Sequence, residues 1–320
     1  MAYVRPLGVY TEIGRLDWQA NTTKTMLLNR ENEVQLYKLR LELTHDNGAN
    51  ASLSVTDLFR AVREIRVVAG GRNNIKMVGA IKMYLNYLKN YGIVPRYQID
   101  STASKTGAKS WVIIEVPFNM FDMMRPIDSI LPSYRFQNLD LKVTFDSATA
   151  VGTDVTITDG SVTVFEDAIE NLNRDFNYGF YKEIFQSKKI SASNPKEELR
   201  LPTEMLYKQF AFISYVDGAL SDDVIKGVTI KSGSKIIKQY SVTEIKEQMR
   251  RRSHNTDEAL LKGMLIVDFA ERGHGTEFID TRASAGGFKQ LSIELDVVAV
   301  GTDNQIDAFS DYYEEIPLKA

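Results

Sequence analysis

Histidine is the side chain that most often supplies metal ligands and acid–base groups near neutral pH, and this chain contains only three. His45, His254 and His274 are far apart, and none belongs to an HxH or HxxxH pair. A bound transition metal normally needs such a cluster together with a further ligand. The spacing therefore predicts no metal centre, and the absence of cysteine removes thiolate ligands and thiol nucleophiles.

Two other segments contain residue types that could do chemistry. Glu271–Glu277 (ERGHGTE) combines an acid, a base and glycines, but the glycines are more typical of a loop than of a catalytic site. Thr106–Ser110 (TGAKS) is similar to the end of a phosphate-binding loop, yet Ala103 and Ala108 stand where that loop requires glycine. No GxSxG nucleophile motif is present. The sequence therefore predicts no catalytic residue, no enzymatic activity and no cofactor.

Several aspartates occur at positions that invite a functional interpretation. Asp128 and Asp280 stand before Ser129 and Thr281 in two similar contexts, where a short carboxylate can hydrogen-bond to the local backbone. They are predicted to structure a repeated turn rather than to catalyse a reaction. A further acidic cluster at 217–223 could bind calcium, but it lacks the pattern of a ligand loop.

The charge balance excludes one class of partner. The 39 basic and 42 acidic residues give a net charge of −3, so no global field attracts nucleic acid. The strongest basic cluster, Met249–Arg252 (MRRR), is at the end of an expected helix, where cations interact favourably with the helix dipole. No direct nucleic-acid binding is expected.

The termini and the absence of cysteine bear on the compartment. A cysteine-free chain is compatible with folding in a reducing environment, and the first residues, MAYVRPLG, contain no apolar signal-peptide core. No later run approaches the ~18 apolar residues of a membrane-spanning helix. Synthesis in the host cytoplasm is the simplest expectation.

Short blocks of alternating apolar and polar residues dominate the chain. Period-two alternation is typical of strands that have one face in a core, and turn-forming sequences such as His45–Gly48 (HDNG) and Ser284–Gly287 (SAGG) separate the blocks. The chain is therefore predicted to be mostly β, and the expected strands are Val34–Leu43, Trp111–Val116, Leu139–Phe145, Val155–Phe165 and Leu291–Val300.

Two segments are predicted to be helical. Asn74–Asn90 has apolar residues at helical spacing, and Ser241–Arg252 opens with SVTE, the sequence of a capping box. Each follows a β-like segment and a glycine turn. This shared order suggests an internal repeat.

Collinear matches support that repeat. Leu36–Lys38 matches Leu206–Lys208, at an offset of 170 residues, and the pentapeptide AVGTD occurs at both Ala150–Asp154 and Ala299–Asp303, at an offset of 149. A drifting offset is expected when two copies of one fold differ by loop insertions. Between these ends lie three further matches, in which Val68–Lys76 pairs with Ile230–Lys238, Ile113–Val116 with Ile266–Phe269, and Phe136–Leu141 with Phe288–Ile293.

Each copy has the length of a β-sandwich of about eight strands. The predicted fold is therefore two consecutive eight-stranded jelly-roll β-sandwiches, each with an inserted helix. The predicted divisions are an N-terminal arm and lead-in at 1–33, a first jelly roll at 34–178, and a second jelly roll with a C-terminal tail at 179–320.

Two collinear jelly rolls in a cysteine-free chain of this length resemble the double jelly-roll major capsid proteins of adenovirus and internal-membrane bacteriophages. The resemblance rests on architecture and repeat across nearly the whole chain. It implies a structural protein of the virion, in which a homotrimer places six barrels in a pseudo-hexameric capsomer of an icosahedral shell. The implied partners are neighbouring capsomers, penton or minor capsid proteins, and an internal lipid membrane in peripheral contact.

The lead-in contains aromatic and basic residues suited to a lipid interface. It is predicted to be a membrane-proximal or inter-subunit arm, and the alternative is a strap packed on its own barrel. Similarly, Ile306–Pro317 (IDAFSDYYEEIP) is expected to be an acidic, aromatic tail that bridges subunits or forms a surface helix. The candidate arm residues are Tyr3, Arg5, Tyr10, Arg15 and Trp18.

Two other functions remain open at this level. The first is a secreted-type double jelly-roll enzyme acting on glycans, or a glycan-binding module, which would need a concave site with convergent carboxylates and aromatic rings. The second keeps the viral setting but makes the chain a minor vertex or spike protein.

Overall fold

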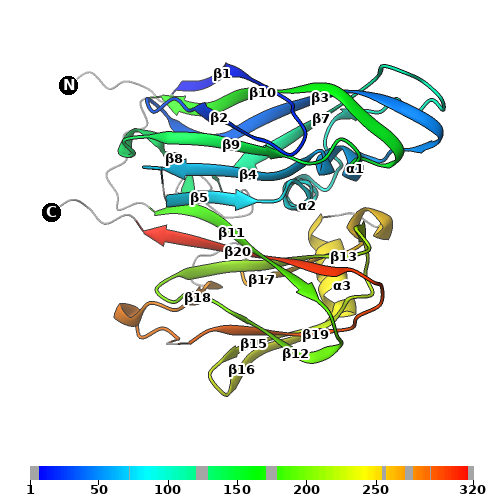
Figure 1. Ribbon diagram of the computed structural model, residues 1–320. Coiled ribbons are helices and arrows are strands. Elements are labelled where there is room, and N and C mark those ends of the chain that lie inside the picture. The colour runs from blue at the N-terminus through cyan, green and yellow to red at the C-terminus, as the bar shows by residue number, and fades with distance from the viewer. Residues whose placement is uncertain are drawn as a thin grey trace, which may run out of the picture.

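The structure is a computed structural model that describes residues 7–71, 73–119, 129–170, 179–253, 257–270, 277–288 and 290–315. Strands dominate, in two units of the same design that lie one above the other in Figure 1. Of the residues that are described, none belongs to a helix long and apolar enough to cross a membrane.

The first unit is a sandwich of two sheets. One sheet has the strand order β1-β10-β3-β7-β6, and the other has the order β2-β9-β4-β5. Its elements are β1 (Leu7–Asp17), β2 (Thr23–Leu27), β3 (Glu33–Ser52), α1 (Val55–Arg60), β4 (Val62–Ala69), β5 (Asn73–Val78), α2 (Ala80–Tyr91), β6 (Tyr97–Gln98), β7 (Ala108–Pro117), β8 (Leu131–Pro132), the 3-10 turn η2 (Ser133–Arg135), β9 (Leu139–Phe145) and β10 (Thr153–Glu170).

The second unit repeats this order. Its sheets are β11-β20-β13, continued by β17 on the free edge of β13, and β12-β19-β15-β16. Its elements are β11 (Gly179–Ile190), β12 (Asn194–Arg200), β13 (Leu206–Val216), β14 (Ala219–Leu220), β15 (Ile225–Ser232), β16 (Lys235–Ser241), α3 (Val242–Ser253), η3 (Glu258–Leu261), β17 (Met264–Asp268), β18 (Ile279–Asp280), η5 (Ala283–Ala285), β19 (Ser292–Val297) and β20 (Asn304–Glu315).

Most strand pairings of the first unit recur in the second. The central strands β3 and β13 each lie between a long last strand, β10 or β20, and the strand that follows the helix, β7 or β17. The short strands β8 and β18 pair with the beginnings of β3 and β13. The predicted duplication and the predicted mostly-β class are therefore both confirmed.

Residues that alternate between apolar and polar along a strand alternate between buried and partly exposed in the sandwich. In β9 the residues Leu139, Leu141, Val143 and Phe145 are fully buried, whereas the residues between them are half-exposed. The prediction of a strand over Leu139–Phe145 was accurate to the residue. It succeeded because period two fixes which side chains share a face.

Helix prediction succeeded for one segment and failed in part for the other. Helix α3 starts one residue after Ser241, whose hydroxyl accepts the Glu244 backbone N–H while the Glu244 carboxylate accepts the Ser241 N–H, as expected for a capping box. The prediction of a helix from Asn74 was wrong at its start. Residues 73–78 instead pair with β4 as β5, because a turn at Gly70 and Gly71, both with positive φ, folds the chain back.

Two further expectations about the ends of the chain are corrected. The first unit begins with β1 and β2, which pair with β10 and β9, so it starts earlier than the predicted boundary at residue 34. The segment after residue 306 is neither a tail nor a helix up to Glu315. It belongs to β20, which lies between β11 and β13 in the middle of a sheet.

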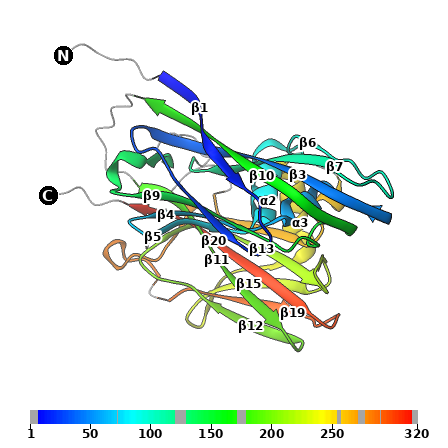
Figure 2. The same cartoon turned by 45° about the horizontal axis from the view of Figure 1, so that its top comes forward.

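The two units share one extended sheet. Strand β5 of the first unit pairs in parallel with β11 of the second, at Lys76↔Glu183 and Met77↔Ile184. Figure 2 shows β5, β11 and β20 side by side at this junction, with α2 close to it. The seam between the sandwiches is therefore built from β5, α2, β11, β20 and β13.

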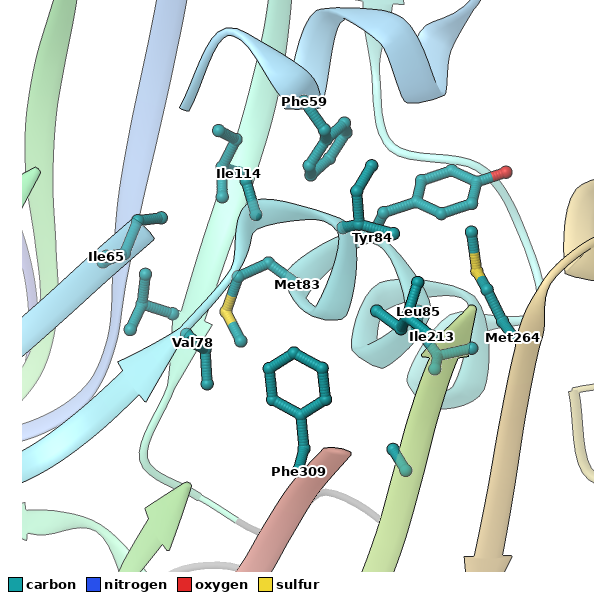
Figure 3. Packing of buried hydrophobic residues seen from close by; sticks show 14 of the residues in the cluster. Phe59, Ile65, Val78, Met83, Tyr84, Leu85, Ile114, Ile213, Met264 and Phe309 are labelled. Carbon is teal, nitrogen blue, oxygen red and sulfur yellow. The ribbon is translucent and has the colours of Figure 1, made fainter. Parts of the chain in front are cut away.

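Helix α2 fills the apolar part of this seam. Figure 3 shows Phe309 of β20 and Ile213 of β13 facing Met83 and Leu85 of the helix, all of them buried. The helix is buried over most of its circumference, as expected for one enclosed between two layers. It ends at Gly92, which adopts the left-handed conformation and donates to the Leu88 carbonyl.

The repeated pentapeptide AVGTD lies at equivalent places in both units, just before the last strand. A Cβ on Gly152 would stand 2.3 Å from the Ser52 carbonyl oxygen, and a Cβ on Gly301 would stand 2.4 Å from a Val216 methyl group. Both contacts are at the end of the central strand, β3 or β13. The glycine is thus required by the close approach of two chain segments.

We expect Gly152→Ala to lower the free energy of unfolding by about 1–3 kcal/mol, because alanine would combine a backbone clash with a φ of 62°. The measurement is thermal and urea unfolding followed by circular dichroism. Gly8→Ala is the matched control, since its Cβ meets no atom within 4 Å, and it should change stability by less than about 0.5 kcal/mol. Equal effects of the two substitutions would contradict this account of Gly152.

Candidate functional site: a buried ion network at the seam

Four charged side chains meet at the seam in complete burial. Lys76 of β5 and Lys82 of α2 come from the first unit, and Glu183 of β11 and Asp311 of β20 come from the second. All four side chains have no exposed surface. The two positive charges balance the two negative charges, which is the condition for keeping ions out of water.

The distances define a branched network. Lys76 Nζ donates to Glu183 Oε2 at 2.6 Å, and Lys82 Nζ donates to Glu183 Oε1 and to Asp311 Oδ2, each at 2.8 Å. Asn86, one helical turn after Lys82, accepts from Lys82 Nζ at 2.8 Å and donates to Glu183 Oε1 at 2.6 Å. Glu183 therefore receives three donors from the first unit.

Asp311 is bound mainly from its own unit. Tyr181 Oη donates to Asp311 Oδ2 at 2.8 Å, and the Gln209 side-chain amide donates to the same oxygen. Tyr181 also presents its ring to Lys76, whose Nζ lies 3.7 Å from the ring centroid. The network thus includes a cation–π contact as well as ion pairs.

The pKa values follow from these contacts. Burial lowers the pKa of Lys76 to about 8, because the attraction of Glu183 and Asp311 only partly offsets the loss of water. Burial also opposes the charge of Lys82, but its two carboxylate partners outweigh it and raise the pKa of Lys82. Burial would raise the pKa of Glu183, yet its two lysines outweigh this effect and hold it well below 4.5.

A second polar cluster crosses the seam at the far end of α2. Lys89 Nζ lies 2.7 Å from Asp268 Oδ2 of β17, and Arg252 of α3 lies 2.5 Å from the same oxygen. On the opposite side, Arg60 of α1 donates to the Gly218 carbonyl at 2.7 Å. Polar contacts of this kind are directional, so they fix the angle between the two units.

This network was not predicted from the sequence. Its signal is a charged residue inside an apolar run, as in Ile75–Val78 (IKMV) and Ala80–Leu85 (AIKMYL). Such a lysine can equally reach water from the edge of a core. Only the pairing of β5 with β11 shows that Lys76 faces a glutamate.

The described arm residues lie on the first sandwich. Tyr10 of β1 stacks on Phe165 of β10, with ring centroids 5.5 Å apart, and remains largely exposed. Arg15 forms an exposed ion pair with Asp17, while Trp18 is half-buried near Phe145. Contact of these residues with lipid or with another subunit stays a prediction, and Tyr3 and Arg5 lie outside the described residues.

The remaining aspartates have local structural contacts. Asp280 accepts the Arg282 backbone N–H at 2.9 Å and pairs with the Arg282 guanidinium, which lowers the pKa of this carboxyl. Its expected counterpart Asp128 lies outside the described residues, so the repeated turn stays a prediction. Within the part of the chain that is described, no group of three or more His, Cys, Asp or Glu side chains could hold a metal ion.

Comparison with known proteins gives matches only through structure. No protein-family model and no curated protein matches the chain. The STIV major capsid protein, from Sulfolobus Turreted Icosahedral Virus, is similar over 97% of both chains, with a TM-score of 0.75 and 15% identity. The chain has the double jelly-roll fold.

Other double jelly rolls match over similar lengths. The major capsid protein P2 of bacteriophage PM2 has a TM-score of 0.63 at 10% identity, covering 98% of this chain and 100% of P2. A chain of the PBCV-1 virus capsid has a TM-score of 0.65 at 11% identity, covering 98% of this chain and 94% of that one. The predicted double jelly roll is confirmed, and at these identities the likeness is one of fold.

We expect Lys76→Met to destabilise the protein by about 3–5 kcal/mol, because it leaves two buried carboxylates with one lysine and hence one uncompensated negative charge. The measurement is urea unfolding at neutral pH. Lys105→Met provides a matched control, since Lys105 forms an ion pair with Asp100 at the surface, and its loss should leave the free energy of unfolding almost unchanged. A similar cost for both variants would contradict the role assigned to burial.

The depressed pKa of Glu183 predicts acid sensitivity. Below about pH 4.5 the unfolded chain binds a proton at this residue while the folded chain does not, so its stabilising contribution is lost as the pH falls towards the folded-state pKa. We therefore expect the unfolding free energy of Glu183→Gln to decrease less steeply than that of the wild type between about pH 5 and about pH 3. The measurement is urea unfolding at a series of pH values, and parallel profiles would contradict the prediction.

Proposed function

We propose that this chain is a viral major capsid protein, a non-enzymatic subunit that builds an icosahedral shell. The observation that carries the proposal is the double jelly roll, which matches known major capsid proteins over nearly the full length of both chains. The match supports a location in the virion, and synthesis in the host cytoplasm is part of the same proposal.

The proposed working unit is a homotrimer. Three copies of a duplicated chain supply six similar sandwiches, which can surround a threefold axis as a pseudo-hexameric capsomer. The seam network supports this arrangement, because two sandwiches held at a fixed angle can present a constant outline to neighbouring subunits. Contacts with adjacent capsomers and with penton or minor capsid proteins belong to the same proposal.

Exposed apolar side chains indicate where association would bury surface. Leu7 and Tyr10 on β1 and Leu27 on β2 lie at sheet edges of the first sandwich. Tyr91, Ile93 and Tyr97, after α2 and on the edge strand β6, are also exposed. Large contiguous apolar patches are rare on monomeric soluble proteins, and we propose that capsomer contacts cover these side chains.

An internal membrane beneath the shell remains part of the proposal. The near-neutral net charge supports a shell that does not wrap the genome directly. The glycan-related function and the minor vertex or spike role are not favoured by the matches, which are to major capsid proteins.

We expect the purified full-length chain to form trimers of hexagonal outline, which mass photometry and negative-stain electron microscopy would detect. Each subunit contact should bury more than about 1,000 Å² if it resembles other specific interfaces. A protein that stays monomeric at high concentration, with no lattice contacts, would contradict the proposal.

Mass spectrometry of the virion would measure the copy number of the chain and so distinguish a major subunit from a vertex protein.

A further inference from the structure

One buried amine at the seam lies between two carboxyl groups of different strands. Lys82 Nζ is 2.8 Å from Asp311 Oδ2 and 2.8 Å from Glu183 Oε1. Glu183 and Asp311 are direct partners in the antiparallel pairing of β11 with β20, so their side chains project from the same face. The amine thus touches one carboxyl group that could acylate it and a second that could carry a proton.

The distance is close to that needed for reaction. The carboxyl carbon of Asp311 is one covalent bond beyond the contacted oxygen, and near-attack conformers hold reacting atoms about 3–3.5 Å apart. The groups cannot drift apart, because α2 and β20 are packed together around Phe309. Proximity of this kind replaces the activation that amide formation otherwise requires.

The surroundings exclude water. None of the three side chains has exposed surface, and the ring of Phe309 lies 5.7 Å from Lys82 Nζ. The ion pairs keep Lys82 and Glu183 charged, so the reaction begins with transfer of one proton from the ammonium to a carboxylate, which removes two buried charges at once. It also produces the two reactants for condensation, an amine and a carboxylic acid.

The two oxygens of Asp311 differ in a way that matches this reaction. Oδ2 accepts hydrogen bonds from Tyr181 Oη and from the Gln209 amide, which would stabilise negative charge on that oxygen during attack. Oδ1 is buried and, among the described residues, has no hydrogen-bond partner. Its departure would break no hydrogen bond and would remove an unsatisfied polar atom from the core.

We propose that Lys82 and Asp311 form an intramolecular isopeptide bond, with Glu183 as the proton-transfer group. The Lys82 nitrogen bonds to the Asp311 carboxyl carbon, and the bond from that carbon to Oδ1 breaks. The ammonium loses two protons, both of which leave with Oδ1 as one water molecule. Glu183 accepts a proton from the attacking nitrogen and returns it to the leaving oxygen, so it ends unchanged.

The product is consistent with the rest of the network. The bond neutralises one positive and one negative charge, and Lys76 and Glu183 remain as a balanced pair 2.6 Å apart. The linked residues are separated by 229 positions and belong to different sandwiches. The bond would therefore join the two jelly rolls covalently, whether or not the chain assembles into a capsomer.

Intact mass spectrometry of the denatured full-length protein tests the bond directly. We expect a mass lower than that of the sequence by one water molecule, and a branched proteolytic peptide that joins Lys82 to Asp311. An unmodified mass, with both residues in linear peptides, would overturn the proposal. So would a branched peptide that joins Lys76 to Glu183 instead.

Two variants test the role of Glu183. Glu183→Gln keeps the size of the side chain but removes its ability to accept a proton, so we expect a folded protein of unmodified mass. Glu197→Gln alters an ion-paired glutamate of β12 away from the seam and should retain the loss of water. Loss of water in Glu183→Gln would overturn the assignment of Glu183, and the wild-type mass decides the bond itself even if that variant fails to fold.

Discussion

The arrangement of this molecule depends on a balance of charge inside the seam between its two sandwiches. Two lysines and two carboxylates are held there without water, and each ion is tolerated only while its partner stays within hydrogen-bond distance. A shift of one sandwich against the other would leave a buried charge unpaired. The network therefore specifies the angle between the two sandwiches more than it adds to the free energy of unfolding. At another angle, a buried charge would lose its partner.

The position of the network explains why it can have this effect. It lies where β5 and β11 pair in parallel, which is the only strand pairing between the units in the described part of the chain. Two residue pairs are too few to fix an orientation by backbone hydrogen bonds alone. Helix α2 adds apolar contacts with β13 and β20 on one side of this junction. The ion network adds hydrogen bonds, which depend on the relative orientation of the two sandwiches.

A rigid pair of sandwiches is a suitable building block for a shell. Each sandwich buries its own core between two sheets. In the proposed capsomer, the outer faces and edge strands would contact other copies. The similarity to capsid proteins of about 10–15% identity indicates that this architecture does not need particular residues at most positions. It needs a repeated pattern of buried and exposed positions, and a seam that holds the two repeats together.

The sequence by itself determined the features that depend on local periodicity and turn chemistry. Alternation identified β9 to the residue, SVTE marked the start of α3, and the AVGTD pentapeptide revealed the duplication. These signals are local, because side-chain period and capping depend on neighbouring residues. Tertiary structure decided the rest: residues 73–78 became a strand because β4 offers them a partner, and residues 304–315 became a central strand between β11 and β13. The ion network was beyond sequence reasoning for the same reason, since Lys82 and Asp311 meet across 229 residues only after both sandwiches have folded.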